Sequence, residues 1–297
     1  MNYECITLNA RRILKDYVKN AGLKSLVLGI SGGIDSAVVA ALARPVCDEL
    51  DIPLIGRSLP ILGNKDDEIE RARKIGSCFC HDFQEFDLWN EYQQVGDTLT
   101  GDVEHPDYAE HDVKIRRGNI KARLRMIFLY DIAQEHKGMV LGTDNLTELF
   151  LGFWTLHGDV GDFGMIQNLW KTDVYELAKY LCKELDNQEK NSIALYDCII
   201  AVPTDGLGIS NSDLDQLGAK DYGEVTMILK TWLTTDIDSF DWDDWLQWEG
   251  RPEHYEDFKN YRESLKFHPV VKRYERTHFK RNNPTNISFY DLILWGE

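Results

Sequence analysis

The stretch Ser25-Leu-Val-Leu-Gly-Ile-Ser-Gly-Gly-Ile-Asp-Ser36 decides the fold of this chain. Its first half, Ser25–Ile30, is a short apolar run, which is typical of a strand buried on both faces. A turn with two glycines follows, and Ala37–Leu42 is a run of good helix formers. The stretch therefore predicts a buried strand, a tight turn and a helix.

The same strand–helix alternation continues along the chain. Ile52–Leu59 and Gly138–Gly142 have the composition of further strands, and Asp66–Ile75 follows the first of them with a helical pattern. This order favours an α/β fold with a doubly wound, mostly parallel sheet flanked by helices. The spacing of apolar residues predicts the other helices over Cys5–Asn20, Gly118–His136, Leu146–Phe153, Thr172–Leu185 and Val270–His278.

Composition limits the classes of function. The 297 residues carry a formal net charge of -17, which argues against a large nucleic-acid surface because phosphate backbones are held mainly by Lys and Arg. No segment approaches the ~20 apolar residues of a membrane helix, and the N-terminus does not resemble a signal peptide. The six cysteines are scattered, so we expect reduced thiols and a cytoplasmic location.

Cys78-Phe-Cys80-His81 is the one cysteine cluster that suggests a metal. A second pair of ligands at suitable spacing is missing, so we favour buried or half-exposed thiols in a strand.

The turn after the first strand has the chemistry of a phosphate-binding loop. Small residues let backbone N–H groups approach phosphate oxygens, and the following helix N-terminus adds partial positive charge. The loop lacks the Gly-Lys-Ser/Thr ending of a P-loop and the spacing of a dinucleotide fingerprint. The alternative is a plain turn whose Ser or Asp caps the helix. The candidate ATP-binding residues of this loop are Gly29, Ser31, Gly32, Gly33, Asp35 and Ser36.

Ser-Gly-Gly-x-Asp-Ser resembles the pyrophosphate loop of the N-type ATP pyrophosphatases, which pass on an adenylate. Three later motifs narrow the resemblance to the NAD synthetase family: Gly118–Met126 with Tyr130, Leu141–Asn145 with Glu148, and Phe279-Lys-Arg281 with Pro284. The resemblance spans about Ile6–Phe289. It implies an adenine nucleotide alpha-hydrolase-like fold and a single NAD synthetase domain over 1–297, with an excursion at about 232–267 that has no clear counterpart.

Asp35 and Glu148 are the candidate metal ligands. Both follow predicted strands, and such junctions gather at the carboxyl edge of a doubly wound sheet. Two carboxylates together with phosphate oxygens suit Mg²⁺. The alternative is that each acid only favours the first turn of its helix.

The resemblance assigns further roles residue by residue. Arg123 and Arg125 lie two apart and so point to different helix faces; a solvated basic helix is the alternative. Asp35 and Lys171 are the implied catalytic residues. ATP is implied to contact Arg123, Thr143, Lys171 and Thr204 as well as the loop, and deamido-NAD to contact Arg125, Tyr130, Asp159 and Lys280.

The implied reaction joins deamido-NAD and ammonia at the expense of ATP, through an NAD-adenylate, and releases AMP and pyrophosphate. Family members are homodimers, so the resemblance implies a dimer. We expect free ammonia or a separate polypeptide as nitrogen source, because no glutaminase module precedes the motifs. The loop after Thr204 is shorter than in typical relatives, a departure that bears on substrate preference more than on the adenylation step.

Two other readings remain open. Another adenylating pyrophosphatase, such as a tRNA-modifying enzyme or a different amide ligase, would share the loop but would favour a basic RNA surface or another acceptor. A nucleotide-binding regulator without catalysis would bind ATP and release no pyrophosphate. Release of AMP together with NAD in an RNA-free assay separates both from an NAD synthetase.

Overall fold

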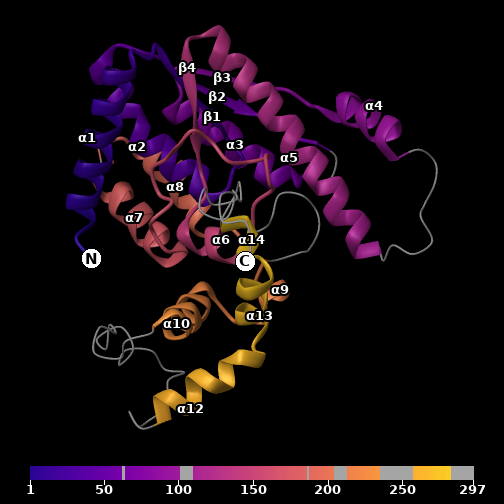
Figure 1. The fold of residues 1–297 in the computed structure, drawn as a ribbon. Coiled ribbons are helices and arrows are strands. Elements are labelled where there is room, and N and C mark those ends of the chain that lie inside the picture. Colours follow the sequence, from indigo (N-terminus) through magenta and orange to yellow (C-terminus); the bar gives the residue numbers. More distant parts are fainter. Residues whose placement is uncertain (62–63, 101–109, 186, 204–212, 235–256, 282–297) are drawn as a thin grey trace, which may run out of the picture.

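The computed structural model describes residues 1–61, 64–100, 110–185, 187–203, 213–234 and 257–281. Within these ranges a sheet lies between two layers of helices (Figure 1). Each pair of neighbouring strands runs parallel, which confirms the expected doubly wound sheet. The strand order is β3-β2-β1-β4-β5, with β1 at Ser25–Gly29, β2 at Leu54–Ser58, β3 at Asp82–Glu85, β4 at Gly138–Gly142 and β5 at Phe163–Gly164.

Helices connect the strands and continue beyond the last of them. The helices predicted from apolar spacing are all present in the structure, with shifted ends. Their bounds are α1 Tyr3–Ala21, α2 Ile34–Leu50, α3 Asp66–Phe79, α4 Trp89–Thr100, α5 Glu110–Glu135, α6 Leu146–Leu151, α7 Lys171–Glu184, α8 Glu189–Ile199, α9 Asp213–Leu217, α10 Tyr222–Leu233, α12 Asp257–Ser264, α13 Pro269–Arg276 and α14 His278–Arg281, with a 3₁₀ turn, η2, at Leu265–Phe267.

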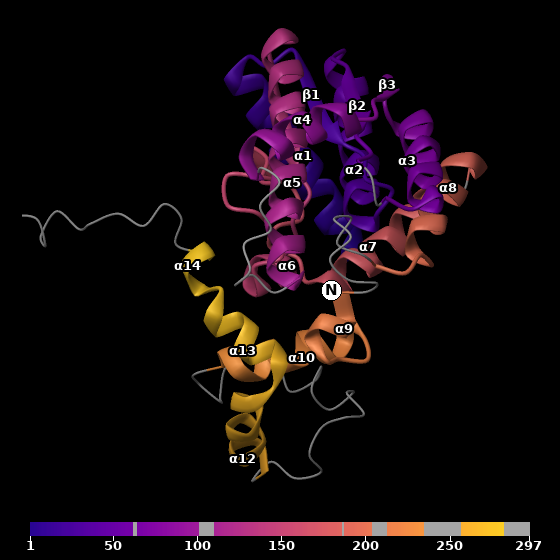
Figure 2. The ribbon, with the colours of Figure 1, turned by 90° about the vertical axis from the view of Figure 1, so that its right-hand side faces the viewer.

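The two faces of the sheet carry different helices (Figures 1 and 2). Successive residues of a strand point to opposite faces. Leu26 and Leu28 of β1 therefore join the core under α1, α2, α3, α7 and α8, whereas Val27 joins the core under α4 and α5. All three side chains are fully buried, which explains why β1 reads as a continuous apolar run.

Helix α2 continues past Pro45, beyond the run of helix formers that predicts it. A proline inside a helix leaves the carbonyl four residues earlier without its N–H donor. That carbonyl belongs to Ala41, and Arg11 of α1 donates to it from Nη2 at 3.5 Å. The packing of α1 against α2 thus compensates locally for the proline.

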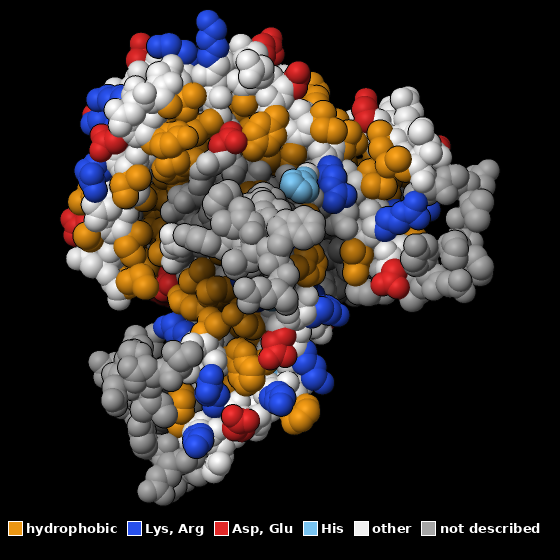
Figure 3. All heavy atoms as spheres, viewed as in Figure 1, with side chains coloured by type: hydrophobic (Ala, Val, Ile, Leu, Met, Phe, Trp, Pro, Cys, Tyr) orange, Lys and Arg blue, Asp and Glu red, His pale blue; other side chains and the backbone are white. Residues whose placement is uncertain are grey.

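A third cluster of buried apolar residues joins α6, α9, α10, α13 and η2 beside the sheet's carboxyl edge. Lys and Arg side chains gather over the helices at the bottom of the view, α12 and α13 among them, although the chain is acidic as a whole (Figure 3).

Of the expected excursion at 232–267, the ends belong to α10 and to α12–η2, and 235–256 lie outside the described residues. The single-domain assignment stays a prediction. In the described part of the chain, no helix is long and apolar enough to cross a membrane.

The expected strand at Cys78–Cys80 is wrong. Cys78 lies in α3 and Cys80 caps that helix, because buried Phe79 continues its apolar face. His81 has both ring nitrogens engaged: Nδ1 accepts from the Leu54 N–H at 3.0 Å, and Nε2 lies 2.9 Å from Asp48 Oδ1. These contacts give His81 a structural role between β2 and α2.

Candidate active site

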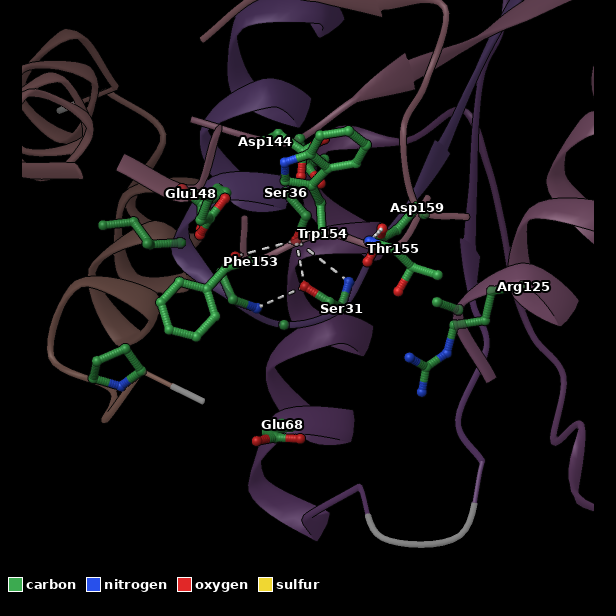
Figure 4. A pocket seen from close by; sticks show the side chains of 18 of the residues that line it. Ser31, Ser36, Glu68, Arg125, Asp144, Glu148, Phe153, Trp154, Thr155 and Asp159 are labelled. Atoms are coloured by element: carbon green, nitrogen blue, oxygen red, sulfur yellow. Dashed lines mark hydrogen bonds between the residues drawn. The ribbon is translucent and has the colours of Figure 1, made fainter. Parts of the chain in front are cut away.

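A cavity of about 610 Å³ opens where β1, β2 and β4 end (Figure 4). Ligands of doubly wound proteins bind at this edge of the sheet. The loop after β1, the turn after β4 and the helices α13–α14 contribute to its wall. The predicted site residues that line it are Gly29, Ser31, Gly32, Gly33, Asp35, Ser36, Arg125, Thr143, Glu148, Asp159, Lys171 and Lys280.

The Ser31–Ser36 loop is closed by its own hydroxyl groups. The Gly33 N–H donates to Ser31 Oγ at 3.2 Å, and the Ser31 N–H donates to Ser36 Oγ at 3.3 Å. Ser36 Oγ in turn donates to the Gly33 carbonyl at 3.1 Å. Gly33 is the N-cap of α2 and offers no side chain to its first-turn N–H groups. A helix start of this kind favours an anion, as the loop composition predicts.

Asp35, Glu148 and Lys171 meet on one side of the loop. Lys171 Nζ contacts Asp35 Oδ2 and lies 3.0 Å from Glu148 Oε1, and its side chain is 4% exposed. Asn145 links the two acids, since its Nδ2 donates to Asp35 Oδ1 at 2.9 Å and its Oδ1 accepts from the Glu148 N–H at 3.1 Å. The backbone N–H of Lys171 donates to Thr147 Oγ1 at 3.0 Å, which fixes the start of α7 beside α6.

Burial and the charges within the cluster act against each other on its pKa values. Burial alone would lower the pKa of Lys171, but the carboxylates of Asp35 and Glu148 outweigh burial and raise that pKa well above its usual range. Burial and the Asp35 charge raise the pKa of Glu148 to about 7, against the opposing effect of Lys171. The cluster therefore holds a charged lysine between two acids, and Glu148 gains a proton more readily than an exposed glutamate does.

The same two acids fit a divalent metal. Both direct an oxygen at one point, where the Lys171 ammonium now lies, so the spot already accommodates positive charge. Hard oxygen donors suit Mg²⁺, which takes one or two protein carboxylates and completes its shell with phosphate oxygens and water. Among the described residues no group of three or more His, Cys, Asp or Glu side chains could hold a metal without such help.

The opposite wall carries the residues expected to hold the second substrate. The Thr155 N–H donates to Asp159 Oδ1 at 2.7 Å, and burial raises the pKa of this carboxyl. Arg125 lies on the same side of the cavity as Asp159 and Thr155 (Figure 4). It donates from Nε to the Leu59 carbonyl at 3.0 Å. Lys280 Nζ donates to the Gly152 carbonyl at 2.7 Å, and burial lowers its pKa to about 8, although Asp159 opposes this.

Arg123 and Tyr130 do not line the cavity. Arg123 donates to the Leu156 carbonyl at 2.9 Å, and Tyr130 donates to Asp162 Oδ1 at 2.9 Å, both outside the cavity wall. The two arginines do point to different sides of α5, as their spacing predicts, and Arg125 is the one that reaches the cavity. Thr204 lies outside the described residues.

Sequence reasoning did not single out several polar residues of the wall, among them Asp144 and Arg71. Asp144 lines the cavity beside Thr143, and burial with the nearby Asp159 and Glu148 charges raises its pKa well above the usual range. Its position directly after β4, inside a motif already singled out, is a signal that could have identified it. Arg71 of α3 also lines the cavity, but in the sequence it is one charge among many on that helix.

Known proteins resemble this chain in sequence and in fold. The family model described as NAD synthase matches residues 6–284. An NH(3)-dependent NAD(+) synthetase of Finegoldia magna is 37% identical over 220 residues, which cover 73% of this chain and 81% of that protein. Among solved structures, an NH3-dependent NAD synthetase of Campylobacter jejuni (TM-score 0.63) and an NMN synthetase of Francisella tularensis (TM-score 0.69) are each 24% identical and cover 97% of this chain and 100% of theirs.

Proposed function

The chain belongs to the NAD synthase family, and on this premise we propose that its cavity forms NAD from deamido-NAD, ammonia and ATP. It is an ammonia-dependent ligase that uses ATP to activate the nicotinate carboxylate. The observation that carries the proposal is the convergence of Asp35, Glu148 and Lys171 beside an anion-binding loop at the sheet edge.

The loop residues bind the triphosphate of ATP through backbone N–H groups, and the carboxylate of deamido-NAD attacks the α-phosphorus and displaces pyrophosphate. Lys171 moves from its carboxylate partners toward the charge that develops on the phosphates. Ammonia then attacks the acyl adenylate, and AMP departs because it is a far better leaving group than oxide. Asp159, Arg125 and Lys280 orient the nicotinate end on the opposite wall.

Asp35 and Glu148 would hold Mg²⁺, which would neutralise phosphate charge when bound. A carboxylate must be ionised to bind the metal. Because the pKa of Glu148 is raised to about 7, protons compete with Mg²⁺ for this side chain at lower pH.

The test is a parallel assay of the purified chain with ATP, MgCl₂ and ammonium chloride. Deamido-NAD is the acceptor in one arm and nicotinate mononucleotide in the other, because one structural neighbour is an NMN synthetase. We expect equal amounts of NAD and AMP in the first arm and much less product in the second. Release of AMP without an amide product in either arm would mean a different acceptor, and no AMP at all would mean that the chain is not an adenylating enzyme.

The proposal includes ammonia as the nitrogen donor. Glutamine in place of ammonium is expected to support no turnover by the chain alone.

The proposal also includes assembly: the enzyme acts as a homodimer. This is supported by the family resemblance and by apolar side chains on the outer side of α5, where Ile127 is 68% exposed.

A further inference from the structure

The phosphate loop is held from outside by two helices. Gly32 adopts φ +78°, and a Cβ at this position would lie 2.1 Å from the Glu68 carbonyl oxygen of α3. Its own carbonyl accepts from Arg71 Nε at 3.0 Å and from Cys198 Sγ of α8 at 3.5 Å. Both donors therefore keep this carbonyl, a negative dipole end, turned toward α3 and α8.

The orientation of this peptide matters for anion binding. In a trans peptide the N–H points opposite to the carbonyl. With the Gly32 carbonyl fixed by Arg71 and Cys198, the Gly33 N–H faces the other way, where it donates to Ser31 Oγ on the cavity side. The contact of Arg71 thus keeps the N–H of the Gly32–Gly33 peptide, and not its carbonyl, on the side where a phosphate would bind.

Arg71 also brings positive charge to a loop that contains no Lys or Arg of its own. The loop lacks the lysine of a P-loop, and Lys171 is shared between two carboxylates. Arg57 lines the cavity too, but its guanidinium donates to Asp82 and to the Gly56 carbonyl. A polyphosphate that enters the loop therefore needs a further cation close to it.

The guanidinium of Arg71 is placed to be that cation. Its side chain is 13% exposed and lines the cavity, and Nη1 donates to Asp67 Oδ2 at 2.6 Å. Nε and Nη1 are used in these two contacts, and Nη2 has no hydrogen-bond partner within the described part of the chain. An arginine held by two of its nitrogens presents the third in a fixed direction.

We propose that Arg71 is a phosphate-binding residue of this site: Nε holds the Gly32 carbonyl, and Nη2 donates to the β,γ-phosphates of ATP and to the pyrophosphate that leaves. The inference rests on the proposed function for the identity of the nucleotide. It concerns a helix outside the motifs that define the loop.

The experiment measures the affinity of the full chain for inorganic pyrophosphate by calorimetry, with adenosine as a ligand that lacks phosphate. Arg71→Met is expected to weaken pyrophosphate binding by about tenfold or more, and Arg71→Lys to restore part of the loss, since a charge-assisted hydrogen bond contributes about 1.5–3 kcal/mol. Adenosine affinity stays unchanged. Arg73→Met is the matched control, because Arg73 lies on the same helix but pairs with Glu85 on the outside.

A second variant separates contact from loop positioning. Cys198→Ala removes the other donor to the Gly32 carbonyl without changing charge, and a smaller loss of pyrophosphate affinity than in Arg71→Met supports direct contact. Equal losses in the two variants, or no loss in Arg71→Met, would overturn the proposal. The binding assay needs no turnover: an Arg71-dependent pyrophosphate site in a chain that makes no NAD would leave this inference standing and remove the proposed reaction instead.

Discussion

Lys171 connects the fold to the chemistry at the scale of single residues. A buried ammonium without partners would be strongly unfavourable, so Asp35 and Glu148 stabilise the junction of α6 and α7 as well as any ligand. The same charges are then available when the substrates arrive. Residues of this kind cannot be assigned to stability or to catalysis alone, and a variant must be measured for both.

Asp35→Asn tests this double role. We expect turnover to fall about a hundredfold or more, because a metal ligand and a lysine partner are lost together. The free energy of unfolding is expected to fall by about 1–3 kcal/mol, since Lys171 keeps Glu148. Initial rates and urea unfolding measure the two effects. Near-normal turnover in this variant would remove Asp35 from the metal site.

Lys280 provides a prediction on pH. Its pKa is lowered to about 8, so the amine is charged below that pH and loses its charge as the pH rises through it. If Lys280 holds an anionic part of deamido-NAD, KM for that substrate should rise above pH 8 while KM for ATP changes less. Lys280→Arg keeps its charge over this range and should flatten the upper limb of the profile. The same rise in the arginine variant would assign it to another group.

Single residues differ in how far the sequence predicts them. Ser31, Gly33 and Asp35 belong to one local motif between a predicted strand and a predicted helix, which together indicate a phosphate site, and all three line the cavity. Arg71 reaches the same loop through tertiary packing of α3, which no local pattern contains. The faces of Arg123 and Arg125 follow from helix geometry, but which face meets the cavity depends on how α5 lies on the sheet.

At the scale of elements, Gly76 is the point where α3 packs directly on a side chain of β3. A Cβ at this position would be 2.0 Å from the ring of Phe83. Phe83 belongs to β3 and packs against the core beneath α3. The glycine therefore sets the distance between the helix that holds the phosphate loop and the edge of the sheet.

Gly76→Ala is expected to lower the free energy of unfolding by about 1–3 kcal/mol, because the helix must move away from the ring. Gly96→Ala is the matched control on α4, where a Cβ meets nothing within 4 Å. There the better helix propensity of alanine should raise stability by about 0.5–1 kcal/mol. Urea unfolding of both variants measures the difference, and a neutral Gly76→Ala would show that the contact relaxes without cost.

The sequence predicts an element well where burial on both faces leaves a continuous apolar run. β1 and β4 are buried and bounded by glycine or polar turns, and the sequence predicts them closely. β3 is short, polar and only partly buried, so it has no apolar signal. The end of α3 does not carry a clear signal in the sequence. Three consecutive apolar residues, Cys-Phe-Cys, suit a buried strand as well as a helix, because the run is too short to show a period.

On the scale of the whole molecule, α5 has one side toward the sheet and the cavity and another side that is exposed. Met126 and Leu129 of α5 face the sheet and are buried, whereas Ile127 is 68% and Tyr130 38% exposed. Tyr130 and Arg123, both expected to meet substrate, lie toward this outer side and not on the cavity wall. A site that is completed by a second subunit would account for their position.

Ile127→Glu tests this arrangement, because a buried charge without a partner opposes association. Light scattering after gel filtration should give twice the chain mass of 34.3 kDa for the unaltered protein and a shift toward 34.3 kDa for the variant. KM for deamido-NAD should rise in the variant, whereas pyrophosphate affinity, which depends on the loop within one chain, should not. Ile193→Glu is the control, since Ile193 is 52% exposed on α8, in the layer on the other face of the sheet. A monomeric parent enzyme with full activity would contradict the dimer and would leave Tyr130 without a role in binding.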